Sequence, residues 1–86
     1  MTRNFDYVTP CWTLVNGGTR YTVYGHKKTA AHGVSYLMQS PSGMWIVGNG
    51  VNIYSTFIGF ECVGDWQHGH YFMDERSKAI RYFESL

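Results

Sequence analysis

The clearest pattern near the start of the chain is a pair of alternating segments joined by a turn. Residues 11–15 and 20–24 alternate between apolar and polar side chains with a period of two, which is typical of strands with one buried face. Residues 16–19 between them read Asn-Gly-Gly-Thr, and glycine readily adopts the positive φ angles of tight hairpin turns. The sequence therefore predicts an antiparallel hairpin. The side chains expected on its inner face are Trp12, Leu14, Tyr21 and Val23.

The C-terminal segment has the periodicity of an amphipathic helix over residues 75–85. Its apolar side chains recur along one stripe, and its charged side chains occupy the other positions. Asp74 has a side chain that is preferred at a helix N-cap, so we expect the helix to follow it. A helix of this length is marginal in isolation and should pack on a sheet to persist. The stripe expected to face the sheet consists of Ala79, Ile80, Phe83 and Leu86.

The segment over residues 29–39 fits two templates. Apolar residues at i, i+1, i+4, i+7 and i+8, from Ala30 to Met38, match one face of a helix. A strand with a period of two would instead use Val34, Tyr36 and Met38. The helical template accounts for more apolar positions, so we predict a second helix near 29–39 with the strand as its alternative.

Shorter segments complete the predicted sheet. Residues 44–47 are apolar and rich in β-formers, and residues 56–63 and 69–73 alternate as two further strands that we expect to pair. Residues 1–9 have no helical spacing and indicate an extended arm or an edge strand. Together these elements predict an α+β fold in a single domain, with an antiparallel sheet of about five strands and the C-terminal helix on one face.

Composition adds a large aromatic content on a nearly uncharged chain. Seven tyrosines, five phenylalanines and three tryptophans occur in 86 residues, and the formal net charge is +1. A small domain cannot easily bury so many rings, so some of them should face a partner. The start of the chain lacks the apolar run of a signal peptide, which favours a cytoplasmic protein without a membrane span. In that compartment Cys11 and Cys62 are expected to be free thiols.

The sequence contains few patterns of residues that would indicate catalysis or metal binding. No nucleophile motif or pair of carboxylates indicates catalysis, so we expect a protein that is not an enzyme and uses no cofactor. His68 and His70 are two residues apart and would share one side of a strand, with Asp65 nearby. A metal site needs further ligands that the spacing does not supply. Metal binding by this pair is therefore kept as a second alternative, and an exposed pair is the expected outcome.

Single-stranded nucleic acid is the first alternative ligand. Proteins that bind it combine aromatic stacking surfaces with a basic groove, and both residue types cluster near the first hairpin. The chain has seven Lys and Arg residues in all, and no RNA-binding motif accompanies them. The candidate residues are Arg20, Tyr21, Tyr24, His26, Lys27 and Lys28.

The leading hypothesis is a protein-binding module. Aromatic residues and methionine are enriched at the centres of protein interfaces, and this chain is rich in both. Small, charge-poor domains of this kind occur as inhibitors and accessory proteins of phages and mobile elements. We therefore expect a protein that occludes a site on a larger protein or complex, and a homodimer stays open as a further partner. The candidate contact residues are Tyr24, Trp45, Trp66 and Tyr71.

Overall fold

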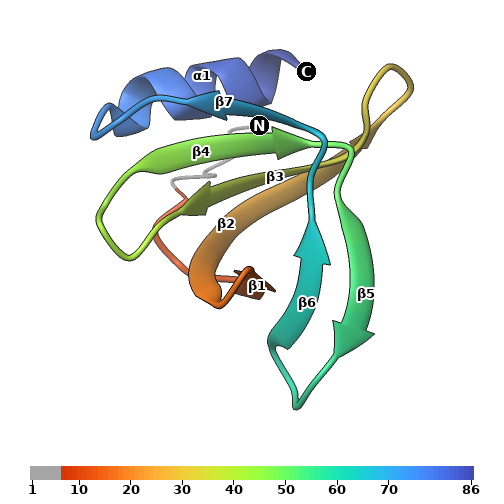
Figure 1. Ribbon diagram of the computed structural model, residues 1–86. Helices are drawn as coiled ribbons and strands as arrows, with labels where there is room; N and C mark the ends of the chain where they lie inside the picture. The colour runs from red at the N-terminus through yellow and green to blue at the C-terminus, as the bar shows by residue number, and fades with distance from the viewer. Residues whose placement is uncertain (1–6) are drawn as a thin grey trace.

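The computed structural model describes residues 7–86, which form a seven-stranded sheet and one helix. The chain is a small domain in which most of the regular structure is sheet (Figure 1). The strands are β1 (Trp12–Asn16), β2 (Thr19–Thr29), β3 (Gly33–Gln39), β4 (Trp45–Asn49), β5 (Asn52–Thr56), β6 (Glu61–Asp65) and β7 (His68–Tyr71), and the helix is α1 (Arg76–Ser85).

The sheet is mixed, whereas the sequence predicted an antiparallel sheet of about five strands. Its order is β5-β6-β1-β2-β3-β4-β7, and every neighbouring pair except one is antiparallel. The exception is β1, which pairs with β6 in parallel through Leu14 and Cys62. This contact joins segments that are far apart in the chain, and local periodicity carries no signal for such a pairing.

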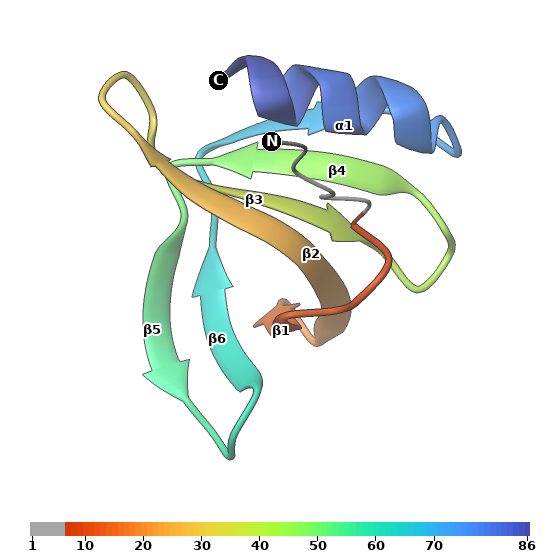
Figure 2. The ribbon, with the colours of Figure 1, turned by 180° about the vertical axis from the view of Figure 1, so that it is seen from behind.

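The sheet bends strongly along β2, its longest strand (Figure 1). The register between β2 and β3 shifts between Val23 and Gly25, and an irregularity of this kind increases the local twist. Figure 2 shows α1 lying over the β3–β4 side, while the β5–β6 hairpin projects away from the helix. The bend therefore separates a helix-covered half of the sheet from a hairpin that the helix does not reach.

Two hydrophobic clusters pack on opposite faces of the sheet. The helix-side cluster lies between α1 and strands β3 and β4, and the far-side cluster fills the concave face of the bent sheet. The helix-side cluster consists of Leu37, Trp45, Val47, Ala79 and Phe83. The far-side cluster consists of Leu14, Val23, Tyr36, Met38, Ile46, Val51 and Cys62.

The first hairpin is confirmed. Trp12 lies opposite Val23 and Leu14 lies opposite Tyr21, so the four predicted side chains share one face. Gly17 and Gly18 form the turn with φ angles of 59° and 82°, which an L side chain adopts only with strain. Local turn chemistry was sufficient to predict this element.

The C-terminal helix on one face of the sheet is also confirmed, with a correction at its start. Ala79 and Phe83 are buried, and Ile80 and Leu86 pack partly against them. The N-cap is Glu75 rather than Asp74, and no side chain caps it. A backbone turn in which the Glu75 N–H donates to the Phe72 carbonyl at 2.9 Å delays the helix by one residue.

The predicted helix over 29–39 is wrong. Residues 30–32 form a turn, and the rest of the segment is the central strand β3. Val34, Tyr36 and Met38 do alternate onto the far-side cluster, but Leu37 is buried on the opposite face. Because both faces of β3 are covered, its apolar positions lose the simple alternation of a one-sided strand and imitate a helical stripe.

The predicted pairing of 56–63 with 69–73 is wrong as well. Strand β6 pairs with β1 and β5, and β7 pairs with β4 at the other end of the sheet. Residues 57–60 form the turn of the β5–β6 hairpin. The predicted arm over 1–9 lies largely outside the described residues. Its last part, Tyr7 to Thr9, is no strand, and the Tyr7 ring packs edge-on against Phe83 at 5.9 Å.

Candidate protein-binding site

The β5–β6 hairpin carries a group of exposed apolar side chains that we call the hairpin surface. Ile58 and Phe60 at its turn are 88% and 76% exposed. Large apolar side chains are normally covered, and a contiguous exposed group of them marks a contact site more often than an isolated one does. The hairpin surface consists of Ile53, Tyr54, Phe57, Ile58 and Phe60.

The architecture explains why these side chains are uncovered. Strand β5 is the edge of the sheet, and all five of its residues are exposed. The turn projects beyond the far-side cluster and is closed by a 2.9 Å hydrogen bond from the Phe57 N–H to the Glu61 carbonyl. Gly59 adopts a φ of 63° there. Backbone hydrogen bonds and turn geometry therefore hold the apolar tip in place without a core beneath it.

The hairpin is almost free of charge. Its sequence from 51 to 65 contains no lysine or arginine, and its acidic residues are Glu61 and Asp65. Glu61 forms an ion pair with Arg20 of β2 at 2.5 Å. Asp65 accepts a hydrogen bond from the Tyr54 hydroxyl, and this bond raises the pKa of Tyr54 above its ordinary value. The hairpin surface is thus an apolar patch with an acidic margin.

A shallow hollow of about 240 Å³ lies at the base of the hairpin. Burial raises the pKa of the Cys62 thiol in its wall, and the thiol donates to the Thr13 carbonyl at 3.5 Å. A thiol held protonated in this way is a poor nucleophile. The lining is chiefly aromatic and aliphatic, and it suits an apolar side chain better than a reacting group. Its residues are Trp12, Tyr36, Ile53, Thr56, Gly59, Phe60, Glu61 and Cys62.

The four contact residues predicted from the sequence do not form one surface. Trp45 is 6% exposed and packs on the Tyr24 ring at 5.2 Å beneath α1. Trp66 packs edge-on against Tyr21 at 5.1 Å, beside the far-side cluster. Tyr71 is exposed, but it lies on β7 at the opposite edge from the hairpin. Phe57 and Phe60, which the sequence analysis placed inside a strand over 56–63, are exposed and were not among the predicted contact residues.

One signal could have found the hairpin surface. Residues 51–60 contain no charged residue and no proline. Their large apolar and aromatic residues are Val51, Ile53, Tyr54, Phe57, Ile58 and Phe60. A short uncharged run of this kind is expected to be either a buried strand or an exposed contact segment. Only the three-dimensional position of the turn, outside both clusters, distinguishes the two cases.

The residues predicted to bind nucleic acid are divided between the two faces of β2. Tyr21 packs on the far-side cluster, while Tyr24 packs on the helix-side cluster. Lys27 reaches the Leu86 carbonyl at 3.3 Å, and its ammonium lies 5.2 Å from the centre of the Phe83 ring. His26 stacks on Trp12 at 4.6 Å, and Arg20 is held by Glu61. Lys28 is exposed near the end of β2.

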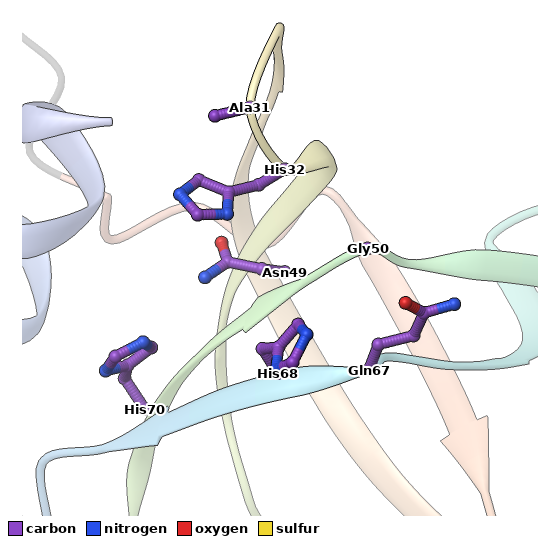
Figure 3. A pocket seen from close by; sticks show the side chains of 7 residues that line it. All are labelled: Ala31, His32, Asn49, Gly50, Gln67, His68 and His70. Atoms are coloured by element: carbon purple, nitrogen blue, oxygen red, sulfur yellow. The ribbon is translucent and has the colours of Figure 1, made fainter.

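A second hollow, of about 420 Å³, collects three of the histidines (Figure 3). His68 and His70 of β7 are exposed on its rim, as the sequence suggested, and His32 reaches it from the β2–β3 turn. His70 stacks on Tyr82 at 4.4 Å. Within residues 7–86, no group of three or more His, Cys, Asp or Glu side chains lies close enough together to hold a metal ion.

The floor of this second hollow is fixed by a buried polar network. The Ser35 hydroxyl donates to Asn49 Oδ1 at 2.6 Å, and Asn49 Nδ2 donates to the Tyr82 hydroxyl at 3.2 Å. Ser35 and Asn49 are almost completely buried. These bonds connect β3, β4 and α1, so their evident role is to hold the helix on the sheet.

Comparisons of this chain with protein families, with curated proteins and with solved structures gave no match. Among the described residues no helix has the length and apolar character needed to cross a membrane.

Proposed function

We propose that this protein is a non-enzymatic protein-binding module that contacts its partner through the hairpin surface and thereby occludes a site on a larger protein. The single observation that carries the proposal is the exposure of Phe57, Ile58 and Phe60 at the tip of a projecting, hydrogen-bonded hairpin. Rigid aromatic anchors on a preformed loop lose little conformational entropy on binding, which is typical of interface hot spots.

The chemistry of the hairpin indicates the kind of partner. An apolar tip fits a hydrophobic depression, and the acidic margin at Asp65 favours a partner with basic residues around that depression. The lack of lysine and arginine on the hairpin disfavours phosphate-rich partners, because both nucleic acid and anionic lipid surfaces bind through such cations. A protein surface is the partner class that this combination supports best.

The test compares two double variants that exchange similar exposed apolar side chains at different edges of the sheet. Ile58→Asp with Phe60→Asp changes the hairpin tip, and Tyr71→Asp with Met73→Asp is the matched control near β7. Tagged proteins are used to capture partners from host lysate, and recovery is quantified by mass spectrometry. We expect the control to retain the proteins captured by the wild type and the tip variant to lose them at least about tenfold, as hot-spot losses of ~2 kcal/mol imply.

The dependence on salt separates this proposal from nucleic-acid binding. Binding through apolar rings should survive moderate salt and show a negative heat-capacity change. Binding to phosphates weakens steeply with salt, and an oligonucleotide titrated at two salt concentrations would reveal it. Equal capture by the wild type and the tip variant would refute the hairpin surface as the contact site.

A further inference from the structure

Three of the four histidines gather around the second hollow, although they lie far apart in the chain. His68 and His70 rise from the same side of β7, and His32 joins them from the β2–β3 turn (Figure 3). The hollow has a volume of about 420 Å³, which is within the range of small-ligand sites. No residue of the hairpin surface lines it. The hollow is therefore a separate feature, created by the fold rather than by local sequence.

The lining of this hollow supplies hydrogen-bond donors without an acidic side chain. An imidazole donates at least one N–H in either protonation state, and the Gln67 amide donates two. The side chains of His32, His68 and Gln67 have no hydrogen-bond partner among residues 7–86. In the same part of the chain no Asp or Glu lines the hollow. A negatively charged ligand would therefore meet several available donors and no repelling carboxylate.

Contacts around the hollow hold these donors in place. The His32 N–H donates to the Thr29 hydroxyl at 3.0 Å, which fixes the turn that carries the His32 ring. His70 stacks on Tyr82 with 4.4 Å between ring centres. Asn49, at the floor, donates to the hydroxyl of the same tyrosine at 3.2 Å. Because donors that are already placed lose little conformational entropy on binding, this arrangement favours a ligand site.

The spacing of the imidazoles selects the kind of ligand. A zinc ion holds its nitrogen ligands at about 2.0–2.1 Å, and within residues 7–86 no group of three such side chains is close enough for that. A tetrahedral oxyanion has oxygens on all sides of its central atom, and each accepts a hydrogen bond from a donor about 2.8 Å further out. Donors too widely spaced for a metal ion can therefore surround a phosphate or sulfate group. The volume leaves room for a small organic body attached to it.

We propose that the hollow formed by His32, His68, His70 and Gln67 binds a tetrahedral oxyanion, the phosphate or sulfate group of a small molecule. Binding strengthens as the pH falls, because an imidazole becomes a cation below about pH 6.5. Tyr82 is the titratable side chain packed against these rings, and among the described lining residues the only groups that can carry a charge are the imidazoles. The site shares no residue with the hairpin surface, so it is independent of the proposed function.

The experiment is an NMR titration of the full chain that follows the four histidine rings. Sodium sulfate is the probe, because it keeps its double charge across the pH range used, and sodium chloride at equal ionic strength controls for screening. At about pH 5.5 we expect the three rings of the hollow to shift along one curve, with a dissociation constant of roughly 1–10 mM. At about pH 8 the affinity should be at least tenfold weaker. His26, which stacks on Trp12 outside the hollow, should not shift.

Two variants test the residues of the site. His68→Gln keeps an amide donor but cannot become a cation, so the affinity for sulfate at about pH 5.5 should fall at least fivefold. Lys78→Gln is the matched control, because it removes an exposed positive charge from α1 outside the hollow. It should change the affinity less than about twofold. Circular dichroism checks that both variants are folded. Inorganic phosphate replaces sulfate in a second titration at about pH 7, and the tighter ligand identifies the preferred group.

Several results would overturn the proposal. They are the lack of any shift up to about 50 mM sulfate, an equal response to chloride, and a shift of His26 along the same curve. Equal losses of affinity in His68→Gln and Lys78→Gln would show that net charge alone attracts the anion. A 1:1 zinc complex through all three rings would assign the hollow to a metal ion instead, because it would show that the rings come close enough to coordinate one.

Discussion

Phe83 and Phe60 are both phenylalanines, but they lie in two regions of this domain with opposite surroundings. Phe83 of α1 is 3% exposed within the helix-side cluster, and Phe60 of the hairpin surface is 76% exposed. The helix-covered half of the sheet has apolar groups packed on both faces, while the hairpin extends beyond both clusters. The aromatic surplus of the chain is therefore divided between a core that stabilises the fold and a surface that the fold leaves open.

The division has an energetic consequence. Fully burying a large apolar side chain stabilises a protein by about 1.5–3 kcal/mol relative to leaving it in water. The side chains of the helix-side cluster make this contribution during folding. The side chains of the hairpin surface are mostly in water, so most of their burial free energy is gained only when a partner covers them. Equivalent substitutions in the two regions should therefore separate stability from binding.

The largest expected difference is between Phe83→Ala and Phe60→Ala. Phe83→Ala opens a cavity between α1 and the sheet and should lower the free energy of unfolding by about 3–5 kcal/mol. Phe60→Ala removes a ring that is mostly in water and should change it by no more than about 0.5 kcal/mol. Urea denaturation followed by circular dichroism measures both. Similar losses for the two variants would show that the hairpin is part of the core.

The sequence predicted those elements of the fold that depend on local signals. The turn at Gly17 and Gly18 and the stripe through Ala79 and Phe83 each lie within one short segment, and both were found. The parallel pairing of β1 with β6 depends on residues almost fifty positions apart, and no local pattern indicates it. The same is true of β3, where the buried Ser35 hydroxyl finds its hydrogen-bond acceptor on Asn49 of β4, fourteen positions away.

The candidate site was less predictable than the fold. The sequence indicated that some aromatic residues would be exposed, but it selected Trp45, which is buried beneath α1. Tryptophan is favoured at interfaces by its size, and the same property favours it in cores. Trp45 is covered because α1 packs over its strand, and Phe60 is uncovered because its hairpin projects away from the helix. Both facts depend on how distant segments are arranged, which the local sequence does not indicate.

A smaller difference is expected between two asparagines, one at the end of β4 and the other at the start of β5, two strands that follow each other in the chain but are far apart in the sheet. Asn49→Ala removes the acceptor of the Ser35 hydroxyl and the donor to the Tyr82 hydroxyl, which should lower the free energy of unfolding by about 1–3 kcal/mol. Asn52→Ala, at the exposed start of β5, should change it by less than about 0.5 kcal/mol. Thermal denaturation of the two variants provides the measurement. A neutral Asn49→Ala would mean that the network does not hold the helix on the sheet.

The smallest expected effect distinguishes two tyrosines whose pKa values are raised for different reasons. Burial in the far-side cluster is the main cause for Tyr36, and the hydrogen bond to Asp65 is the main cause for Tyr54. Asp65→Asn should therefore lower the pKa of Tyr54 towards 10.0 and leave that of Tyr36 unchanged. Titration of ¹³Cζ signals by NMR resolves the two rings, and Tyr54→Phe assigns one of them.

The two tyrosines also predict how stability changes at high pH. Because the folded state holds both phenolic protons more tightly than the unfolded chain does, this contribution to stability is complete below the ordinary pKa of 10.0. It is lost as the pH rises through the folded-state pKa values. At Tyr54 the loss should disappear in Asp65→Asn, since the carboxylate is its source, whereas at Tyr36 it should persist because burial is unchanged. If Asp65→Asn altered the titration of Tyr36 as strongly as that of Tyr54, the hairpin and the far-side cluster would be electrostatically one unit, and the separation between hairpin and core would fail.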